Sequence, residues 1–231
     1  MADNGMQIRF GVRAIQDSRL GGQVLKEDGK DVFYSHNDYI WNPMLLTRDA
    51  VNPWGSDINN RSINGYLKVG VPLNEDNSQN IAMVLDYSYQ KMDSYFGATK
   101  YLAGQHSAFG NLLYQNEINE SHKFTVGMSA TYDRYDEDFA RVVMMQNVAD
   151  KGITDMTVGG FFGEYTYHAG ETFSAIVGLR EDFYKKTGDK VAARFSPRIN
   201  LKYMPVEEVV LRANGGRGVR YSTPLIDNIG V

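Results

Sequence analysis

The sequence predicts an all-β fold, an antiparallel meander of about nine long strands that forms part of a transmembrane β-barrel. Three observations lead to this expectation. Apolar residues recur at every second position along most of the chain, which places them on one face of a strand. Tyrosines gather toward the ends of these runs. Short polar turns alternate with longer connections, as they do in barrels that cross an outer membrane.

The stretch from Ser62 to Leu73 shows the alternation most clearly. Its apolar set is Ile63, Gly65, Leu67, Val69, Val71 and Leu73, and its polar set is Asn64, Tyr66, Lys68 and Gly70. Comparable runs occupy residues 7–16, 81–90, 106–118, 123–133, 161–168, 174–182, 198–203 and 209–214. We expect each run to be a strand, most of them near the roughly 9–11 residues that cross a bilayer at a tilt.

The predicted connections differ in length in a regular way. Short turns are expected at Asn74–Ser78, Asn119–His122, Gly170–Thr172 and Pro205–Glu208, and longer loops at Gly21–Arg61, near Gly97–Gln105 and at Phe139–Asp155. In an outer-membrane barrel the short turns face the periplasm and the long loops face the exterior. The sequence therefore predicts both a barrel and its orientation.

The apolar face of the runs is rich in tyrosine. The tyrosines concerned are Tyr87, Tyr89, Tyr114, Tyr132, Tyr165, Tyr167 and Tyr203. A girdle at a membrane interface explains them, because the ring is apolar and the hydroxyl stays in water. Ordinary strand propensity is the alternative explanation. Alternation alone also leaves open a soluble sandwich, whose polar face lies in bulk water.

Composition excludes several classes of protein. The mean hydropathy is −0.40, and no stretch approaches the roughly 20 apolar residues of a spanning helix. The chain has no cysteine, which removes thiol catalysis, cysteine metal sites and disulfides. A net charge of −4 without a basic run argues against nucleic-acid binding. The four histidines lack metal-ligand spacing, so we expect neither an enzyme nor a cofactor.

Several motifs occur in an order that resembles one known family. They are Ser196–Tyr203 (SPRINLKY), Val210–Arg220 (VLRANGGRGVR) and Ser222–Gly230 near the end, with Gly160–Tyr167 (GFFGEYTY) and Val177–Asp182 (VGLRED) before them. Together they resemble the mid-barrel strands of TonB-dependent outer-membrane receptors. Phe10–Ala14, Gly21–Gln23 and Asp93–Gly97 are similar to Bacteroidota members of that family.

The resemblance implies a monomeric barrel of about 22 strands in the cell outer membrane, filled by a plug domain. Such a receptor imports a scarce nutrient (a ferric siderophore, cobalamin or a glycan) with energy from the TonB complex. The expected partners are outer-membrane lipid, the plug and the TonB complex. Residues 1–231 contain no plug, TonB-box or closing C-terminal strand, so we expect a partial barrel. The alternatives are a complete small outer-membrane barrel, acting as a pore or adhesin, and a soluble β-barrel that binds a ligand.

Two groups of residues are candidates for function. In the predicted loop Gly21–Arg61, the aromatic side chains of Tyr34, Tyr39, Trp41 and Trp54 suit stacking against a ligand ring. A self-packed lid is an equal alternative. On the polar face, an ionic ladder across neighbouring strands is expected from Arg180, Asp182, Arg198 and Arg212. Support of the barrel wall is its expected role, ahead of contact with the plug.

Overall fold

The computed structural model describes residues 5–22, 24–27, 30–33, 55–96, 99–143 and 146–219. All regular structure in these ranges is β-strand. The strands are β1 (Gln7–Gly22), β2 (Val24–Glu27), β3 (Lys30–Phe33), β4 (Gly55–Pro72), β5 (Gln79–Phe96), β6 (Thr99–Asn119), β7 (His122–Val143), β8 (Gln146–Ala169), β9 (Phe173–Lys186), β10 (Ala192–Val206) and β11 (Val209–Gly216). Within the described part, no helix has the length and apolarity to cross a membrane.

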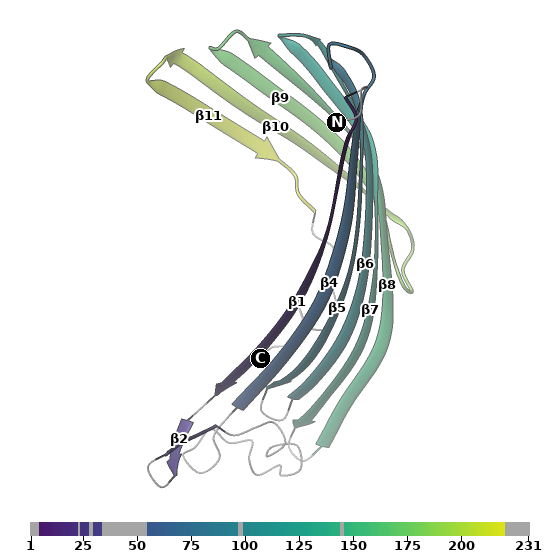
Figure 1. Cartoon of the computed structure of the whole chain (residues 1–231), viewed down its shortest axis with the longest axis vertical. Coiled ribbons are helices and arrows are strands. Elements are labelled where there is room, and N and C mark those ends of the chain that lie inside the picture. Colours follow the sequence, from purple (N-terminus) through teal and green to yellow (C-terminus); the bar gives the residue numbers. More distant parts are fainter. Residues whose placement is uncertain are drawn as a thin grey trace.

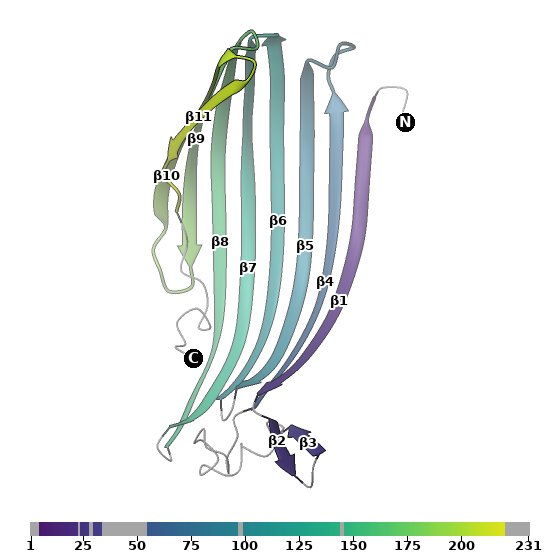
Figure 2. The ribbon, with the colours of Figure 1, turned by 90° about the vertical axis from the view of Figure 1, so that its left-hand side faces the viewer.

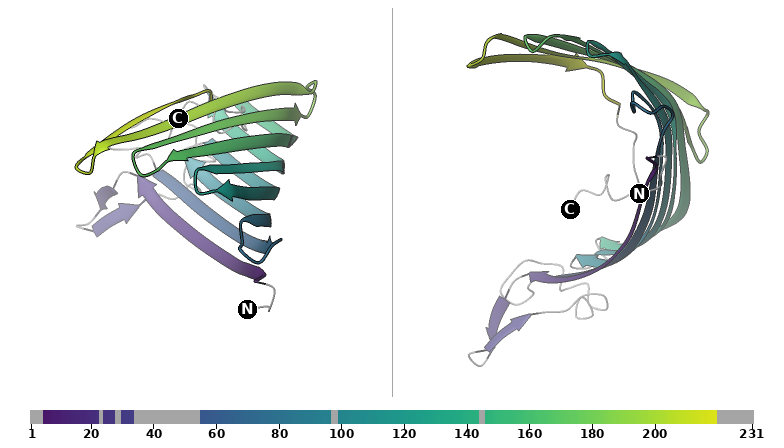
Figure 3. Two further views of the ribbon diagram at one scale, coloured as in Figure 1. Left: turned by 90° about the horizontal axis from the view of Figure 1, so that it is seen from above. Right: turned by 45° about the horizontal axis from the view of Figure 1, so that its top comes forward.

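Nine of the strands form one antiparallel sheet in the order β1-β4-β5-β6-β7-β8-β9-β10-β11. Consecutive strands of this sheet lie side by side (Figures 1 and 2), and β2 and β3 form a separate hairpin. The sheet is twisted and curved into an open trough (Figure 3), with β1 and β11 as its two edges. The predicted all-β meander of about nine strands is therefore confirmed, as an open sheet.

The four predicted short turns are present and lie between β4 and β5, β6 and β7, β8 and β9, and β10 and β11. Local hydrogen bonds fix the first of them. Asn74 Oδ1 accepts from the Gln79 backbone N–H at 3.0 Å, and Asp76 accepts from the Ser78 backbone N–H at 3.1 Å. The hydrogen bonds from Ser78 hold the pKa of the Asp76 carboxyl below its usual value.

The long loops were predicted with the wrong extents. β1 and β4 run to Gly22 and from Gly55, which shortens the predicted loop Gly21–Arg61. β5 and β6 are separated only by residues 97–98, and β7 and β8 only by residues 144–145, so the other two predicted loops are largely strand. The strands are accordingly longer than expected, at 24 residues for β8. On β7 and β8 the apolar alternation covers only part of the strand, whereas the backbone ladder continues where polar residues occur at both parities.

The two faces of the sheet differ in polarity and in exposure. Directly paired residues share a face, so the register assigns Phe10, Leu67, Leu85 and Gly110 to one face in a continuous row. Large apolar side chains on this face are exposed, among them Phe10 at 79%. The buried charged residues Asp133, Glu137 and Asp182 all lie on the opposite face. Side chains are crowded together on the concave face of a curved sheet and spread apart on its convex face. The face that holds the buried charged residues is therefore the concave one.

Candidate membrane band and lumen wall

An apolar band crosses the convex face of the sheet and is interrupted on β9 by Glu181, the register partner of Phe161. On β7 it runs from Phe124 to Tyr132 and includes Val126 and Met128, which are 45% and 50% exposed. Eight residue steps at about 3.3 Å each give about 26 Å along the strand. This length is of the same order as the roughly 25 Å apolar band of an outer-membrane barrel. The exposed side chains have the chemistry of a surface that faces lipid.

Aromatic residues border the band on the side of the short turns. Tyr114 packs against Phe124, with ring centroids 5.8 Å apart. His122 lies between Tyr165 and Tyr167, with its Nδ1 2.5 Å from the Tyr165 hydroxyl and its ring 5.2 Å from that of Tyr167. These rings link β6, β7 and β8 along one edge of the band, as an interfacial girdle does.

A second aromatic row borders the opposite edge of the band. The Tyr87 hydroxyl lies 2.8 Å from His106 Nδ1, and the Tyr89 ring lies 4.6 Å from the His106 ring. The Tyr132 hydroxyl donates to Asp155 Oδ1 at 2.6 Å. All the tyrosines predicted to form a girdle lie on the convex face. Beyond this row, charged residues such as Arg134 replace apolar ones on the convex face.

Arg180 and Asp182 form an ion pair on the concave face of β9. Arg180 Nη2 lies 2.6 Å from Asp182 Oδ1, and Nε donates to Oδ2 at 2.9 Å. Nη2 also donates to Ser129 Oγ on β7 at 2.8 Å. The guanidinium reaches Ser129 across β8 because Gly160, which pairs with both Ser129 and Asp182, has no side chain. The Arg180 guanidinium carbon lies 5.8 Å from the centre of the Phe162 ring.

Arg198 repeats this arrangement one strand further along. Its Nη2 forms an ion pair with Glu164 Oε2 on β8, so the side chain crosses β9. It crosses at Gly178, which is the register partner of both residues, and a Cβ at Gly178 would lie 2.6 Å from Arg198 Nε. The two side chains are 62% and 28% exposed, so the pair contributes at most about 1 kcal/mol.

The four residues of the expected ionic ladder lie on one face, but their ion pairs do not join neighbouring strands. Arg180, Asp182, Arg198 and Arg212 do share the concave face. Asp182, however, pairs with Arg180 of its own strand, and Arg198 pairs with a residue two strands away. Arg212 on β11 is the register partner of Lys202, a like charge, and has no ion pair among the described residues. Long arginine side chains pass over glycines instead of linking adjacent strands.

A buried polar cluster that was not predicted lies on the concave face, beyond the apolar band. The buried Tyr101 hydroxyl donates to Glu137 Oε1 at 2.6 Å. Nearby, Gln105 Nε2 donates to Asp133 Oδ1 at 3.4 Å and to the Tyr135 hydroxyl at 3.2 Å. Its members are odd-numbered on β6 and β7, which places them on one face, but Tyr101 and Gln105 lie in a segment that was expected to be a loop.

The predicted ligand residues Tyr34, Tyr39, Trp41 and Trp54 lie outside the described residues. They belong to the connection between β3 and β4. Among the described residues, no group of three His, Cys, Asp or Glu side chains is arranged to hold a metal ion. The described residues form a sheet that resembles a barrel wall, with an apolar convex face and a charged concave face.

Comparison with known proteins identifies the family of this wall. A family model described as "TonB dependent receptor-like, beta-barrel" matches residues 9–230, whereas a search of curated proteins finds no match. The fold superposes on a chain of the FpvAI–pyocin S2 complex, with a TM-score of 0.54, 9% identity, and coverage of 70% of this chain and 31% of that one. It also superposes on BauA, the ferric preacinetobactin receptor from Acinetobacter baumannii, with a TM-score of 0.54, 9% identity, and coverage of 69% and 30%. The chain thus spans about a third of these structures, and it belongs to the TonB-dependent receptor-like β-barrel family.

Proposed function

We propose that this chain is part of the wall of an outer-membrane active transporter, which imports a scarce nutrient with energy from the TonB complex. One observation carries the proposal: a single uninterrupted meander has an exposed apolar convex face and a charged concave face. A closed barrel built from such a sheet faces lipid outside and water inside. Arg180, Asp182, Arg198 and Arg212 then line the lumen.

We further propose that the chain is a segment of a larger barrel that also has a plug domain. Two features support this idea. The edges β1 and β11 do not pair with each other, and an unpaired edge is not tolerated in lipid. The similar solved structures are about three times as long as the matched region. The implied protein partners are further strands, the plug and the TonB complex. Outer-membrane lipid surrounds the barrel in this proposal, and nucleic acid is not a partner.

The transported ligand is a ferric siderophore, cobalamin or a glycan, with a ferric siderophore first because BauA is a ferric preacinetobactin receptor. The short turns face the periplasm, so the extended strand ends face the exterior and meet the ligand. The motifs Phe10–Ala14 and Asp93–Gly97 favour a Bacteroidota receptor.

The test is a transport assay on the full-length gene product. Deleting the gene is expected to abolish growth on one ligand of a panel of ferric siderophores, cobalamin and glycans, and inactivating TonB is expected to abolish it equally. Uptake that survives loss of TonB would indicate a passive pore instead. A product that stays monomeric in buffer without detergent would indicate a soluble ligand binder and overturn the proposal.

The aromatic residues before β4 are proposed to contact that ligand. Replacing Trp41 and Trp54 with alanine in the full-length receptor is expected to weaken ligand binding by about tenfold or more, because stacked aromatic rings contribute strongly to binding. Titration calorimetry of the purified receptor measures the affinity. An unchanged affinity, with the folded barrel retained, would favour the self-packed lid. Replacing Tyr66 with phenylalanine, on the concave face of β4, is the matched control.

A further inference from the structure

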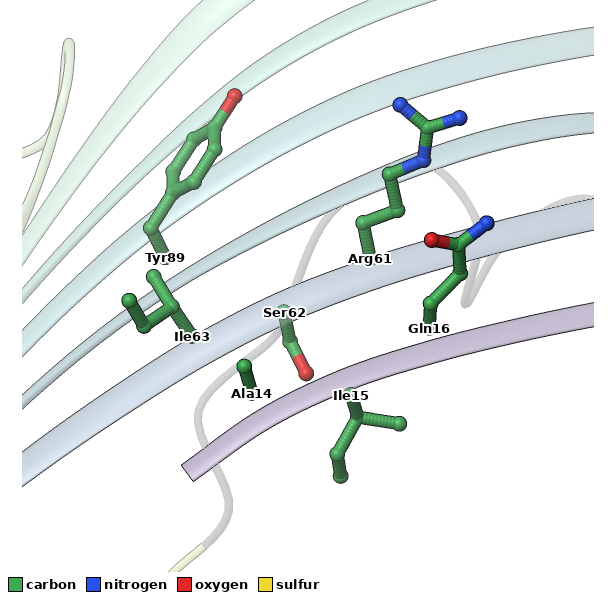
Figure 4. Close-up of a pocket in the computed structure, with 7 residues that line it drawn as sticks. All are labelled: Ala14, Ile15, Gln16, Arg61, Ser62, Ile63 and Tyr89. Atoms are coloured by element: carbon green, nitrogen blue, oxygen red, sulfur yellow. The ribbon is translucent and has the colours of Figure 1, made fainter. Parts of the chain in front are cut away.

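A pocket lies on the convex face where the apolar band of β1, β4 and β5 meets their polar extensions (Figure 4). Its volume is about 410 Å³. The side chains of Gln16, Arg61, Ile63 and Tyr89 project to one side of the ribbon, whereas Ser62 points the other way. Ala14, Ile63 and Tyr89 form the apolar part of the lining, and Gln16 and Arg61 form the polar part. The pocket is therefore amphipathic.

The polar end of this pocket carries the positive charge of Arg61, and Lys91 lies beside the lining residues on β5. Arg61 is the register partner of Gln16 on β1 and of Lys91 on β5, so two cations lie directly opposite each other. Like charges in this position destabilise a sheet. Among the described residues, Arg61 has no ion pair, whereas Lys91 Nζ pairs with Asp93 Oδ2 at 3.8 Å. An anion between Arg61 and Lys91 relieves the repulsion.

An arginine without an ion pair is not a general feature of this edge of the band. Arg134 occupies a similar height on β7, next to His106 in register. Its guanidinium already has a partner, because Nη1 lies 3.6 Å from Asp155 Oδ1. Arg61, by contrast, has no ion pair among the described residues and lines a hollow.

We propose that this pocket binds a phosphorylated membrane lipid, with its phosphate on Arg61 and Lys91. An acyl chain then runs along Ala14 and Ile63 into the apolar band. A guanidinium binds phosphate in a bidentate manner, and the Tyr89 ring suits the boundary between acyl chain and headgroup. A free phosphate makes no use of the apolar half, which is why a lipid is the occupant. This proposal rests on the membrane location proposed above.

Native mass spectrometry of the full-length receptor in detergent tests the site. The probes are lipid A and the same lipid with its phosphates removed. Wild-type receptor is expected to retain lipid A, and the double variant Arg61→Gln/Lys91→Gln is expected to bind it at least about tenfold more weakly. Arg134→Gln, the matched control at a similar height, is expected to bind as wild type does. Ala14→Phe, which fills the apolar half, is expected to weaken lipid A binding while leaving the cations in place.

Three results would overturn the proposal. The double variant retains lipid A as well as wild type does, the dephosphorylated lipid binds equally well, or inorganic phosphate alone displaces lipid A. Migration of the unheated, folded barrel on gels shows that each variant is folded. If the receptor does not partition into outer membranes, the proposed function fails as a whole. If the receptor partitions into outer membranes and transports its ligand, but lipid binding does not depend on Arg61, only the lipid site is excluded.

Discussion

Replacing Leu85 with arginine is expected to destabilise the full-length receptor in a bilayer by about 2–4 kcal/mol, the cost of an arginine at the midplane of a lipid-facing barrel surface. Leu85 is 43% exposed on the convex face and lies midway between Ile81 and Tyr89 on β5. Its register partners are Leu67 and Gly110, so no carboxylate is directly opposite the new charge. Urea unfolding of the receptor in phospholipid vesicles measures the change.

The matched control for this prediction is Ser88→Arg, three positions further along the same strand. Ser88 lies on the concave face between Asn64 and Ser107, and Asp86, which accepts from Asn64 Nδ2 at 2.9 Å, is close by. A charge on the lumen face keeps its water, so a change within about 1 kcal/mol is expected. Equal effects of the two substitutions would show that the convex face does not face lipid.

The second large effect is expected at Gly160, where alanine should cost about 1–3 kcal/mol of unfolding free energy. A Cβ at this position would overlap Asp182 Oδ1 and lie 2.9 Å from Arg180 Nη2 and 3.0 Å from the Glu181 backbone oxygen. The backbone oxygen belongs to the β8–β9 ladder and cannot move freely. The Arg180–Asp182 pair must therefore shift away from Ser129. The same unfolding measurement in vesicles detects the loss.

Gly159→Ala provides the control, because this neighbouring glycine lies on the convex face with nothing within 4 Å of its Cβ position. Alanine there is expected to be neutral or stabilising by up to about 1 kcal/mol, since it restricts the unfolded chain. Adding Arg180→Met tests the mechanism. If the clash acts through the ion pair, the costs of Gly160→Ala and Arg180→Met are less than additive. Full additivity would indicate that Gly160 acts independently of Arg180.

The sequence predicted those parts of the strands in which apolar and polar residues alternate. On β5, the alternation from Ile81 to Tyr89 predicted the strand and its convex face. The continuation of β5 to Phe96 and the start of β6 at Thr99 were not predicted. There both faces of the sheet carry polar residues, so a period of two is no longer visible although the backbone pairing persists.

The contacts of the candidate wall residues could not be predicted from the alternation of residues alone. Their spacing of two along β9 places Arg180 and Asp182 on one face of the sheet. The contact with Ser129 depends on the registers of β7 with β8 and of β8 with β9. Register is a property of paired strands, and periodicity within one strand does not determine it. The glycines at Gly160 and Gly178 were the available clue, because a missing side chain between two long polar ones invites a crossing contact.

In the proposed transporter, the extension of the strands past the apolar band would bear on how cargo is selected. From Tyr132 to the end of β7 at Val143 the ladder continues for eleven residue steps, or about 36 Å at 3.3 Å per residue. On β7 and β8, this end of the sheet is therefore paired backbone, which is stiff. A cargo that reaches it meets side chains already held in place, such as Tyr101 on Glu137, so little ordering cost is left to subtract from affinity. In such a transporter, discrimination by shape would begin well before the cargo reaches the bilayer.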